Sequence, residues 1–422
     1  MLKDYRNALR LVSRNTWLVL IAAAMTGFSY TGIFIMLLNL YLLRLGFGPE
    51  FIGAINATAQ LGFALFSLPA GALGQRWGSR KMTIYGLVIG AAAFGLLPLA
   101  ELLPFTWRAT WLMATYVLAW LAGALYLVNA YPFLMASTGP EERSYAFSIR
   151  QALVPLGTLV GNFSGGLLPV LLVTWLGVSP EQPAPYRYGL LAGVGALLIG
   201  VLALSATREV NLKQPQPRAA VAPGGAMPAG LMVFMAALMF FFTAAYGTAG
   251  TFTGVYMDER LQISTASIGT VMAVSQLLGV PVALMMPVIV TRWGKFGAIR
   301  DGLLVLAIGL LPLAFVPNWA AAGIGFIGVS VAYALITPAL TLSQQEIVPP
   351  AWRATMSGAM IMARGSGTAF MAFGGGYLID AYGYPSLFLS GALLAMMGAG
   401  LIWLYSWAPR WFLMRHKGVT AT

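Results

Sequence analysis

Two arginines fall inside long apolar runs of the sequence, where an isolated charge is unfavourable. Arg150 lies seven residues beyond the loop residue Arg143, and Arg364 lies eleven residues beyond Arg353. At 1.5 Å per helical residue, they are about 10 Å and 16 Å deep in an apolar layer. A guanidinium at such depth needs water, an acid or a ligand, and its planar fork suits a carboxylate, phosphate or carbonyl. We expect Arg364 to bind a ligand, with pairing to Glu346 as the alternative, and Arg150 to bind a ligand or to snorkel to the nearer surface.

Further polar side chains at similar depth come in pairs. Gln60 recurs as Gln276 and Tyr30 recurs as Tyr246, with the same offset along the chain in both cases. Hydrogen bonds between helices are the simplest explanation for buried amides and phenols, but matched positions in two repeats also suit a shared binding site. We include both pairs among the expected substrate-binding residues, together with Asn129 and Tyr333.

Metal and acid–base chemistry have little support in the sequence. Cysteine is absent and His416 is the single histidine, so we expect no metal site. None of the twelve Asp and Glu residues falls in the middle of an apolar run, so proton coupling would have to use Asp258, Glu259 or Glu346 near a run's end. Nucleotide-binding loops and nucleophile–base arrangements are also missing. We therefore expect neither an enzyme nor a cofactor.

The elements that must position these side chains are hydrophobic helices. Of the 422 residues, 59% are apolar and 9% are charged, whereas soluble domains carry about 25% charged residues. The net charge of +12 would suggest nucleic acid in a soluble protein, but here it fits basic loops beside a bilayer. Runs long enough to span a bilayer occur twelve times, at about 16–43, 51–73, 82–100, 109–136, 146–175, 188–207, 230–256, 268–291, 302–316, 319–343, 354–379 and 386–407. The sequence predicts an all-α polytopic membrane protein.

A proline-rich segment at 208–228 separates the first six runs from the last six and predicts a solvated linker. We expect an N-terminal half at 1–207 and a C-terminal half at 229–422. Eighteen Lys and Arg residues fall on the side that holds both termini, and four fall on the other side. This bias predicts cytoplasmic termini in a multi-pass protein of the cytoplasmic membrane. One such chain forms a complete pathway, so we expect a monomer.

The two halves repeat one another. Ile-Gly at 52, Gln-Leu at 60 and Arg-Trp-Gly at 76 return in the same order and at one constant offset, at 268, 276 and 292. Parallel repeats of this kind are related by an axis along the membrane normal and place a binding site between them near the midplane. The sequence therefore predicts two pseudo-symmetric six-helix bundles around a central cavity.

The loop after the second run reads GALGQRWGSRK at 71–81. It resembles the signature Gly-x-x-x-Asp-Arg-x-Gly-x-Arg-Lys of the major facilitator superfamily, with a glutamine where that family has aspartate. Together with twelve spans and a central linker, the resemblance covers the whole chain and implies a secondary transporter that works by alternating access. The positions of this loop that correspond to the signature are Gly71, Gln75, Arg76, Gly78, Arg80 and Lys81.

In that family the loop acts as a cytoplasmic latch, so the resemblance implies that these residues take part in gating. Gln75 brings no charge, which weakens that half of the latch. Arg76 can still pair with a carboxylate, and Glu141 and Glu142 are the nearest candidates. The alternative is that the basic residues of the loop only set the topology.

The fifth run carries Gly157, Gly161 and Gly165 at a spacing of four. This row is similar to the antiporter signature of drug-exporting members, Gly-x-x-x-Gly-Pro-x-x-Gly-Gly, with Asn162 in place of proline. Glycines at this spacing form one helix face that lets a neighbouring backbone approach closely. The contact would either seal a leak path during gating or simply pack two helices.

Two transport functions remain, and both need a small-molecule substrate. The glycine row and the 21 methionines, which suit adaptable apolar walls, favour efflux of amphipathic molecules. The buried arginines favour the alternative, an importer or uniporter of a small organic anion or other polar solute. A non-transporting receptor would be expected to lose the latch motif, which is mostly intact here. The bilayer and a coupling ion such as a proton are the other expected partners, and nucleic acid is not.

Overall fold

The computed structural model describes residues 13–208, 229–349 and 352–407, and within them all regular structure is helical. The first half of the chain contains α2 (Arg14–Thr26), η1 (Gly27–Phe34), α3 (Ile35–Arg44), α4 (Pro49–Trp77), α5 (Ser79–Leu96), η2 (Leu97–Leu102), α6 (Phe105–Ser137), α7 (Pro140–Leu176) and α8 (Ala184–Ser205). The second half contains α9 (Ala229–Glu259), α10 (Thr265–Phe315), α11 (Trp319–Glu346), α12 (Arg353–Tyr382) and α13 (Tyr384–Trp407). Most of the predicted linker, 209–228, lies outside the described residues.

Eleven helical segments in the described part are long and apolar enough to cross a membrane, and the first of them is the continuous run α2–η1–α3. The twelfth long helix, α12, contains Arg364 and packs against α9 of the second half and α4 of the first half. Helix α10 contains two spans because the chain turns sharply at Gly294, where φ is +71°. The predicted all-α fold is confirmed.

Local signals at the helix ends explain where several helices begin. The side chains of Ser13, Ser264 and Asn318 accept hydrogen bonds from backbone N–H groups at the starts of α2, α10 and α11. These bonds satisfy donors that have no partner within the helix. Gly78 joins α4 to α5 with a φ of +92°, and its counterpart in the repeat, Gly294, forms the equivalent turn with a φ of +71°. The two halves therefore share this turn as well as their helix pattern.

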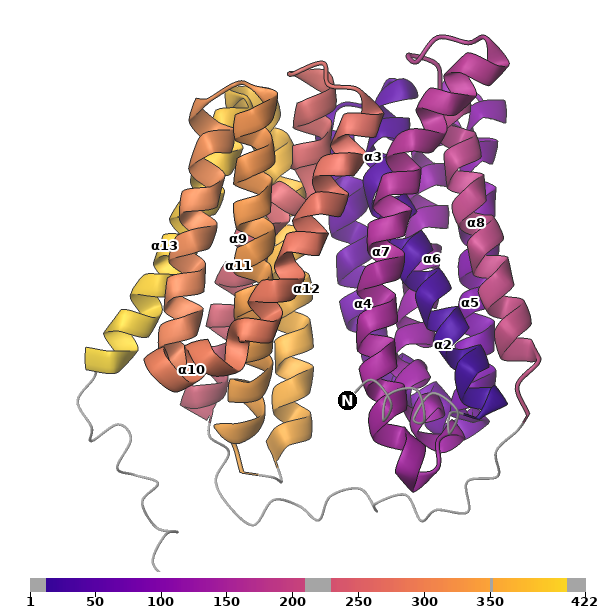
Figure 1. The fold of residues 1–422 in the computed structure, drawn as a ribbon. Helices are drawn as coiled ribbons and strands as arrows, with labels where there is room; N and C mark the ends of the chain where they lie inside the picture. The colour runs from indigo at the N-terminus through magenta and orange to yellow at the C-terminus, as the bar shows by residue number, and fades with distance from the viewer. Residues whose placement is uncertain (1–12, 209–228, 350–351, 408–422) are drawn as a thin grey trace, which may run out of the picture.

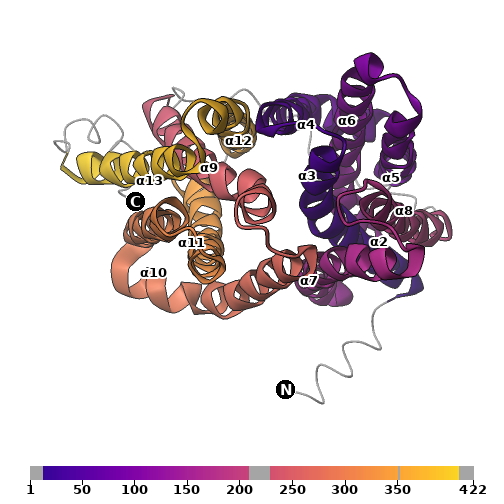
Figure 2. The same ribbon diagram turned by 90° about the horizontal axis from the view of Figure 1, so that it is seen from above.

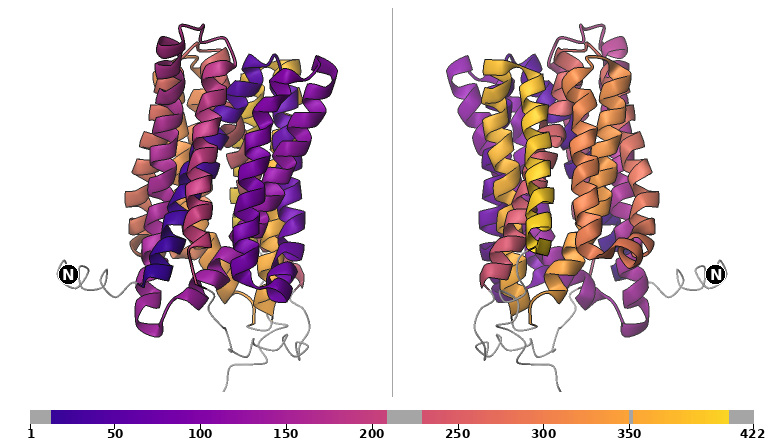
Figure 3. Two further views of the ribbon diagram at one scale, coloured as in Figure 1. Left: turned by 90° about the vertical axis from the view of Figure 1, so that its right-hand side faces the viewer. Right: turned by 90° about the vertical axis from the view of Figure 1, so that its left-hand side faces the viewer.

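The first half, α2 to α8, and the second half, α9 to α13, form two bundles that lie side by side (Figure 2). Helix α2 begins and α13 ends at the same end of the molecule, as both side views show (Figure 3). We call this end the terminal face; it also contains the α4–α5 turn at Gly78. The opposite end, where α3 ends at Arg44 and α9 ends at Glu259, is called the distal face.

The two halves touch through close backbone contacts, where α4 meets α12 and α7 meets α10. A Cβ added to Gly53 would lie 2.2 Å from the carbonyl oxygen of Ala372, and one added to Gly166 would lie 2.8 Å from that of Thr265. Both contacts lie toward the distal face, and the ribbons of the two halves separate toward the terminal face (Figure 1). Glycine is required here because no side chain fits between the backbones.

Candidate functional site

Three of the predicted polar residues come together in the second half. Arg364 of α12 donates a hydrogen bond from Nη2 to the hydroxyl oxygen of Tyr333 on α11, at 3.0 Å. The ring of Tyr333 packs against that of Tyr246 on α9, with centroids 4.5 Å apart. Residues far apart in the sequence thus form one cluster on three helices, which we call the Arg364 cluster.

Arg364 keeps donors free for a ligand. Its side chain is solvent-exposed although it lies near the middle of α12. Among the described side chains it forms no ion pair, and Glu346, the predicted alternative partner, pairs with Lys295 instead. A guanidinium has five N–H donors, and the bond to Tyr333 uses one of them. A charge at this depth is costly in lipid, so the prediction that Arg364 faces water between the halves stands on its exposure and lack of an ion pair.

Gln60 approaches the Arg364 cluster from the first half. A Cβ added to Gly365 would lie 2.4 Å from the side chain of Ala64 and 3.4 Å from the carbonyl oxygen of Gln60, so α4 and α12 touch beside Arg364. The Gln60 side chain is half-buried. Gln276, its counterpart on α10, is also half-buried and lies one helical turn before Gly279, which packs on α11 near Tyr333.

Tyr30 and Asn129 take part in packing within the first half. The Tyr30 hydroxyl donates to the carbonyl oxygen of Ala119 on α6, and its ring packs on Phe94 of α5. The Asn129 amide donates to the carbonyl oxygen of Ala70 at 3.0 Å and thereby joins α6 to α4. Both side chains are thus used between helices of the first half, and neither belongs to the Arg364 cluster.

Arg150 is buried, with 4% of its surface exposed. Its guanidinium lies 4.0 Å from the ring centroid of Tyr131 on α6, a cation–π contact. This contact stabilises the charge within the protein, and binding of a ligand at Arg150 stays a prediction. Tyr131 is itself 40% exposed.

Glu142, one of the two carboxylates expected to pair with Arg76, binds other partners. Glu142 is buried and accepts hydrogen bonds from the backbone N–H groups of Ser13, at 2.7 Å, and Gly139, at 2.9 Å. It thereby joins the start of α2 to the start of α7. Arg76 is exposed and forms no ion pair among the described side chains. The side chain of Glu141 lies outside the described residues.

A different arginine of the same loop ties two helices together. Arg80 donates from Nε to the Thr207 hydroxyl at 2.9 Å, and from Nη2 to the carbonyl oxygens of Thr207 and Ser205. Ser205 is the last residue of α8 and Thr207 follows it, so both carbonyls lack a partner within the helix. Arg80 therefore anchors the last helix of the first half to the α4–α5 turn. Of the other predicted latch residues, Gln75 and Lys81 are exposed and Gly71 packs on Val128.

The glycine row of α7 packs on the first span. A Cβ added to Gly157 would lie 2.4 Å from the carbonyl oxygen of Ala24, and one added to Gly161 would lie 2.2 Å from that of Phe28. Gly165 continues the row against Met36 of α3 at a wider spacing. The row thus provides a backbone-to-backbone contact within the first half, and its role in gating stays a prediction.

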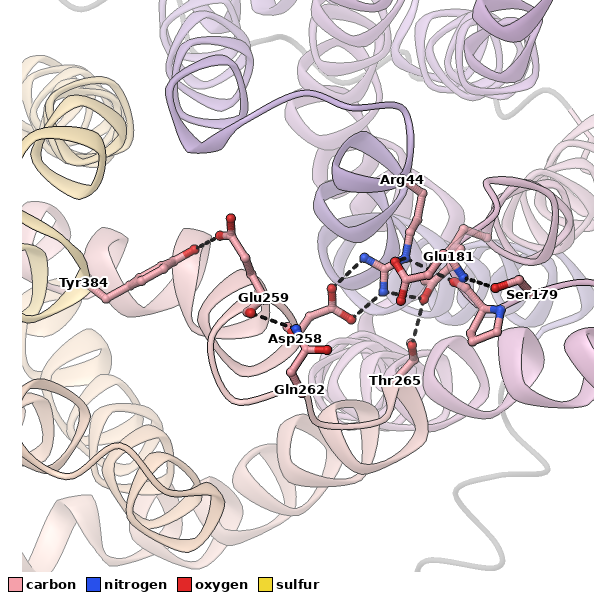
Figure 4. Close-up of polar contacts among 10 residues, drawn as sticks. Arg44, Ser179, Glu181, Asp258, Glu259, Gln262, Thr265 and Tyr384 are labelled. Atoms are coloured by element: carbon pink, nitrogen blue, oxygen red, sulfur yellow. Dashed lines mark hydrogen bonds and ion pairs between the residues drawn. The ribbon is translucent and has the colours of Figure 1, made fainter.

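An ion pair that the sequence analysis missed joins the halves at the distal face (Figure 4). Arg44, at the end of α3, donates to both carboxylate oxygens of Asp258, at the end of α9, at 2.7 and 2.8 Å. Only 11% and 7% of the two side chains are exposed. The guanidinium also donates to the Tyr186 hydroxyl and to the carbonyl oxygen of Pro180. Both residues lie at the end of the first span of their half, and this matched position is the sequence signal that could have identified the pair.

A second polar link between the halves lies one turn deeper. The amide of Asn39 donates to the carbonyl oxygen of Thr251 on α9 at 2.9 Å, and its own oxygen accepts from Asn56. We call this link and the Arg44–Asp258 pair the distal gate. Within the described residues, no group of three or more His, Cys, Asp and Glu side chains could hold a metal ion.

Comparisons with known proteins agree with this architecture. A family model described as Major Facilitator Superfamily matches residues 19–372. Among solved structures, a D-xylose-proton symporter superposes with a TM-score of 0.72 at 13% identity, covering 93% of this chain and 97% of that one. The nucleoside transporter NupG gives a TM-score of 0.69 at 15% identity over 93% and 99% of the two chains.

A bacterial homolog to the human lysosomal transporter Spinster, in an inward-facing and occupied conformation, gives a TM-score of 0.68 at 16% identity over 93% and 96% of the two chains. No curated protein matches the sequence. Identities this low show a shared fold and leave the cargo open. The family match and these transporter folds indicate a membrane transporter rather than an enzyme, and the drug-exporting branch is not distinguished. The chain belongs to the Major Facilitator Superfamily.

Proposed function

We propose that this protein transports a small amphipathic solute that carries an anionic group, and that it works by alternating access. The observation that carries the proposal is the state of Arg364: exposed near mid-span, oriented by Tyr333, and without an ion pair among the described side chains. A carboxylate or phosphate on the solute would supply the missing partner through charge-assisted hydrogen bonds. The rings of Tyr246 and Tyr333 would contact the apolar part of the same solute.

Gln60 links solute binding to movement of the two halves. It belongs to α4 of the first half, whereas Arg364 belongs to α12 of the second, and the two helices touch beside both residues. A solute held by both side chains would favour the arrangement in which the halves approach each other. Differential binding of this kind is what allows a ligand to shift a conformational equilibrium.

The conformation described here is closed at the distal face and has its halves apart at the terminal face. The excess of basic residues on the terminal side supports a cytoplasmic terminal face, so we assign this state as inward-open in the cytoplasmic membrane. The 1–207 and 229–422 halves would move about the 208–228 linker as two bodies. A single chain holds all residues of the proposed site, which supports a monomer.

Direction and coupling follow from the same contacts. The glycine row that favoured export packs α7 on the first span, and helix packing of this kind does not favour efflux over import. The three carboxylates considered for proton coupling all have partners: Asp258 binds Arg44, Glu259 accepts from Tyr384, and Glu346 binds Lys295. We therefore base the proposal on the anionic cargo, the alternative from sequence, and not on efflux or proton coupling.

Thermal-shift screening of the purified protein tests the proposed cargo class. Carboxylates, organic phosphates and organic cations of matched size are compared in the wild-type protein and in Arg364→Met, followed by flux of the best ligand in proteoliposomes. We expect stabilisation by anions alone and its loss in the variant. Stabilisation by cations, or an equal response of Arg364→Met to anions, would contradict the proposal.

A further inference from the structure

The first span contains an unusual segment near its middle. Residues Gly27–Phe34, η1, form a π-helix, and such segments are rare and occur often at functional sites. Its wider turn changes the directions in which successive side chains leave the helix. The segment therefore needs an explanation beyond spanning the membrane.

Three successive sides of η1 are covered by helices of its own half. Ser29 donates to the carbonyl oxygen of Gly193 on α8, Tyr30 donates to that of Ala119 on α6, and Gly32 packs against Gly161 of α7. Thr31, whose hydroxyl contacts Thr158 at the edge of α7, is exposed. Helix α8 lies on the side of the first span away from the second half (Figure 2). Thr31 therefore points to the space between the halves.

Thr31 and Arg364 lie at similar depth. The constant offset of the repeat makes Gly247 the counterpart of Thr31, just as Tyr246 is the counterpart of Tyr30. A Cβ added to Gly247 would lie 3.5 Å from Thr368, which is one helical turn from Arg364 on α12. One turn of helix is about 5.4 Å, so the two side chains differ in depth by about one turn.

The hydrogen bonds around Thr31 leave it able to accept from a ligand. Its hydroxyl lies 2.9 Å from the carbonyl oxygen of Gly27 and 2.5 Å from the hydroxyl of Thr158 on α7. Either hydroxyl of the Thr31–Thr158 pair can be the donor, since Thr158 also lies 3.0 Å from the carbonyl oxygen of Val154 and 3.3 Å from that of Gly27. A hydroxyl oxygen accepts two hydrogen bonds, so at least one acceptor position of Thr31 is free whichever hydroxyl donates.

We propose that Thr31 is a specificity-determining residue that accepts a hydrogen bond from a hydroxyl or ammonium group of the anionic solute. The inference rests on the proposed function at Arg364 and narrows the cargo to hydroxylated or amino-bearing organic anions. Thr158 positions Thr31 by fixing the direction of its free lone pair. Arg364 of the second half and Thr31 of the first half would thus bind two different groups of the same solute molecule.

Binding by the purified full chain tests this assignment with 3-phenylpropionate and its derivatives hydroxylated at carbon 2, at carbon 3 or at the para position of the ring. One hydroxylated isomer should bind about three- to tenfold more tightly than the parent acid, the range of a single net hydrogen bond. Thr31→Val should remove this preference without changing binding of the parent acid. Thr31→Ser, which keeps the hydroxyl, should retain the preference.

The outcomes separate the two proposals. If none of the acids binds the wild-type protein, the anion site at Arg364 is refuted and the role of Thr31 is refuted with it. If the parent acid binds but hydroxylation never helps, or if Thr31→Val keeps the preference, only the role of Thr31 is refuted. Thiol accessibility gives an independent check, because the chain contains no native cysteine. Thr31→Cys should react with a polar thiol reagent from the terminal side and Ser29→Cys should not, and an unreactive Thr31→Cys would overturn the orientation.

Discussion

Asp258→Asn should open the distal gate without unfolding the protein. Arg44 and Asp258 belong to different halves, so their ion pair exists only while the distal face is closed. The substitution leaves Arg44 largely buried, and its remaining acidic neighbour, Glu181, is exposed and 3.7 Å away. Removing one partner of a buried pair costs about 3 kcal/mol or more. Because each 1.4 kcal/mol is tenfold, the ratio of distal-closed to distal-open molecules should fall roughly a hundredfold.

A thiol placed inside the contact between the halves reports this change. Ala57 of α4 is buried against Ala369 and Ala372 of α12, and the chain has no native cysteine. In an Ala57→Cys background, Asp258→Asn should raise the rate of labelling from the distal side by up to about a hundredfold. The double variant Arg44→Asp with Asp258→Arg, in which the two charges are exchanged, should restore slow labelling.

A matched ion pair within one half provides the control. Arg187 on α8 pairs with Glu101 at 2.6 Å, and both residues belong to the first half. Glu101→Gln removes a partly buried pair at the same face without touching the contact between halves, so labelling at position 57 should stay slow. Unchanged labelling in Asp258→Asn, or an equal rise in Glu101→Gln, would refute the role of the distal gate.

Three further results are expected. Gly161→Ala should lower the melting temperature, because its Cβ would lie 2.2 Å from a backbone oxygen and overpacking costs about 1–3 kcal/mol. Gly195→Ala, where the added Cβ has open space, should leave the melting temperature unchanged. Equal melting temperatures of the two variants would show that no close contact exists at Gly161. Arg80→Ala should increase protease cleavage near residue 207, since Arg80 holds the end of α8, and unchanged cleavage would remove that role. Arg76→Ala should reduce transport and spare folded yield, because Arg76 is exposed; equal losses of both would make it structural.

Features that depend on one-dimensional patterns were predictable from the sequence. Hydropathy located the helices, and the repeat of the latch loop in the second half returns as positive φ angles at Gly78 and Gly294. The depth of Arg364 and the lack of an acid nearby predicted a charge without an ion pair, and among the described side chains Arg364 is exposed and hydrogen-bonded to Tyr333 without one; its position between the halves stays a prediction. The depth of a residue in a membrane-spanning helix follows directly from its position in the sequence, so it can be predicted without knowing how the helices pack.

Direction around a helix axis was not predictable from the same patterns. Asn129 was selected for its depth, but its side chain turns to the backbone of α4. The π-helix at η1 shifts the directions of Tyr30 and Thr31, and hydropathy contains no signal for it. Glu142 was assigned to Arg76, yet the Gly139-Pro140 start of α7 makes it a partner for free backbone N–H groups. The Arg44–Asp258 pair forms only where the two halves approach each other, and the sequence pattern of one half does not predict that approach.

The central claim is that Arg364 makes the space between the halves attractive to anions, and one measurement tests it without knowledge of the cargo. In Gln60→Cys, rates of reaction from the terminal side are compared for a negatively charged sulfonate reagent and a positively charged ammonium reagent, each relative to a free thiol. For charges about 8 Å apart in water, the Coulomb energies of the two reagents differ by about 1 kcal/mol, so the anion should be favoured about fivefold or more. Arg364→Met should abolish the preference and Arg364→Lys should keep it. A preference that persists in Arg364→Met, or a thiol that is unreactive from the terminal side, would contradict the account.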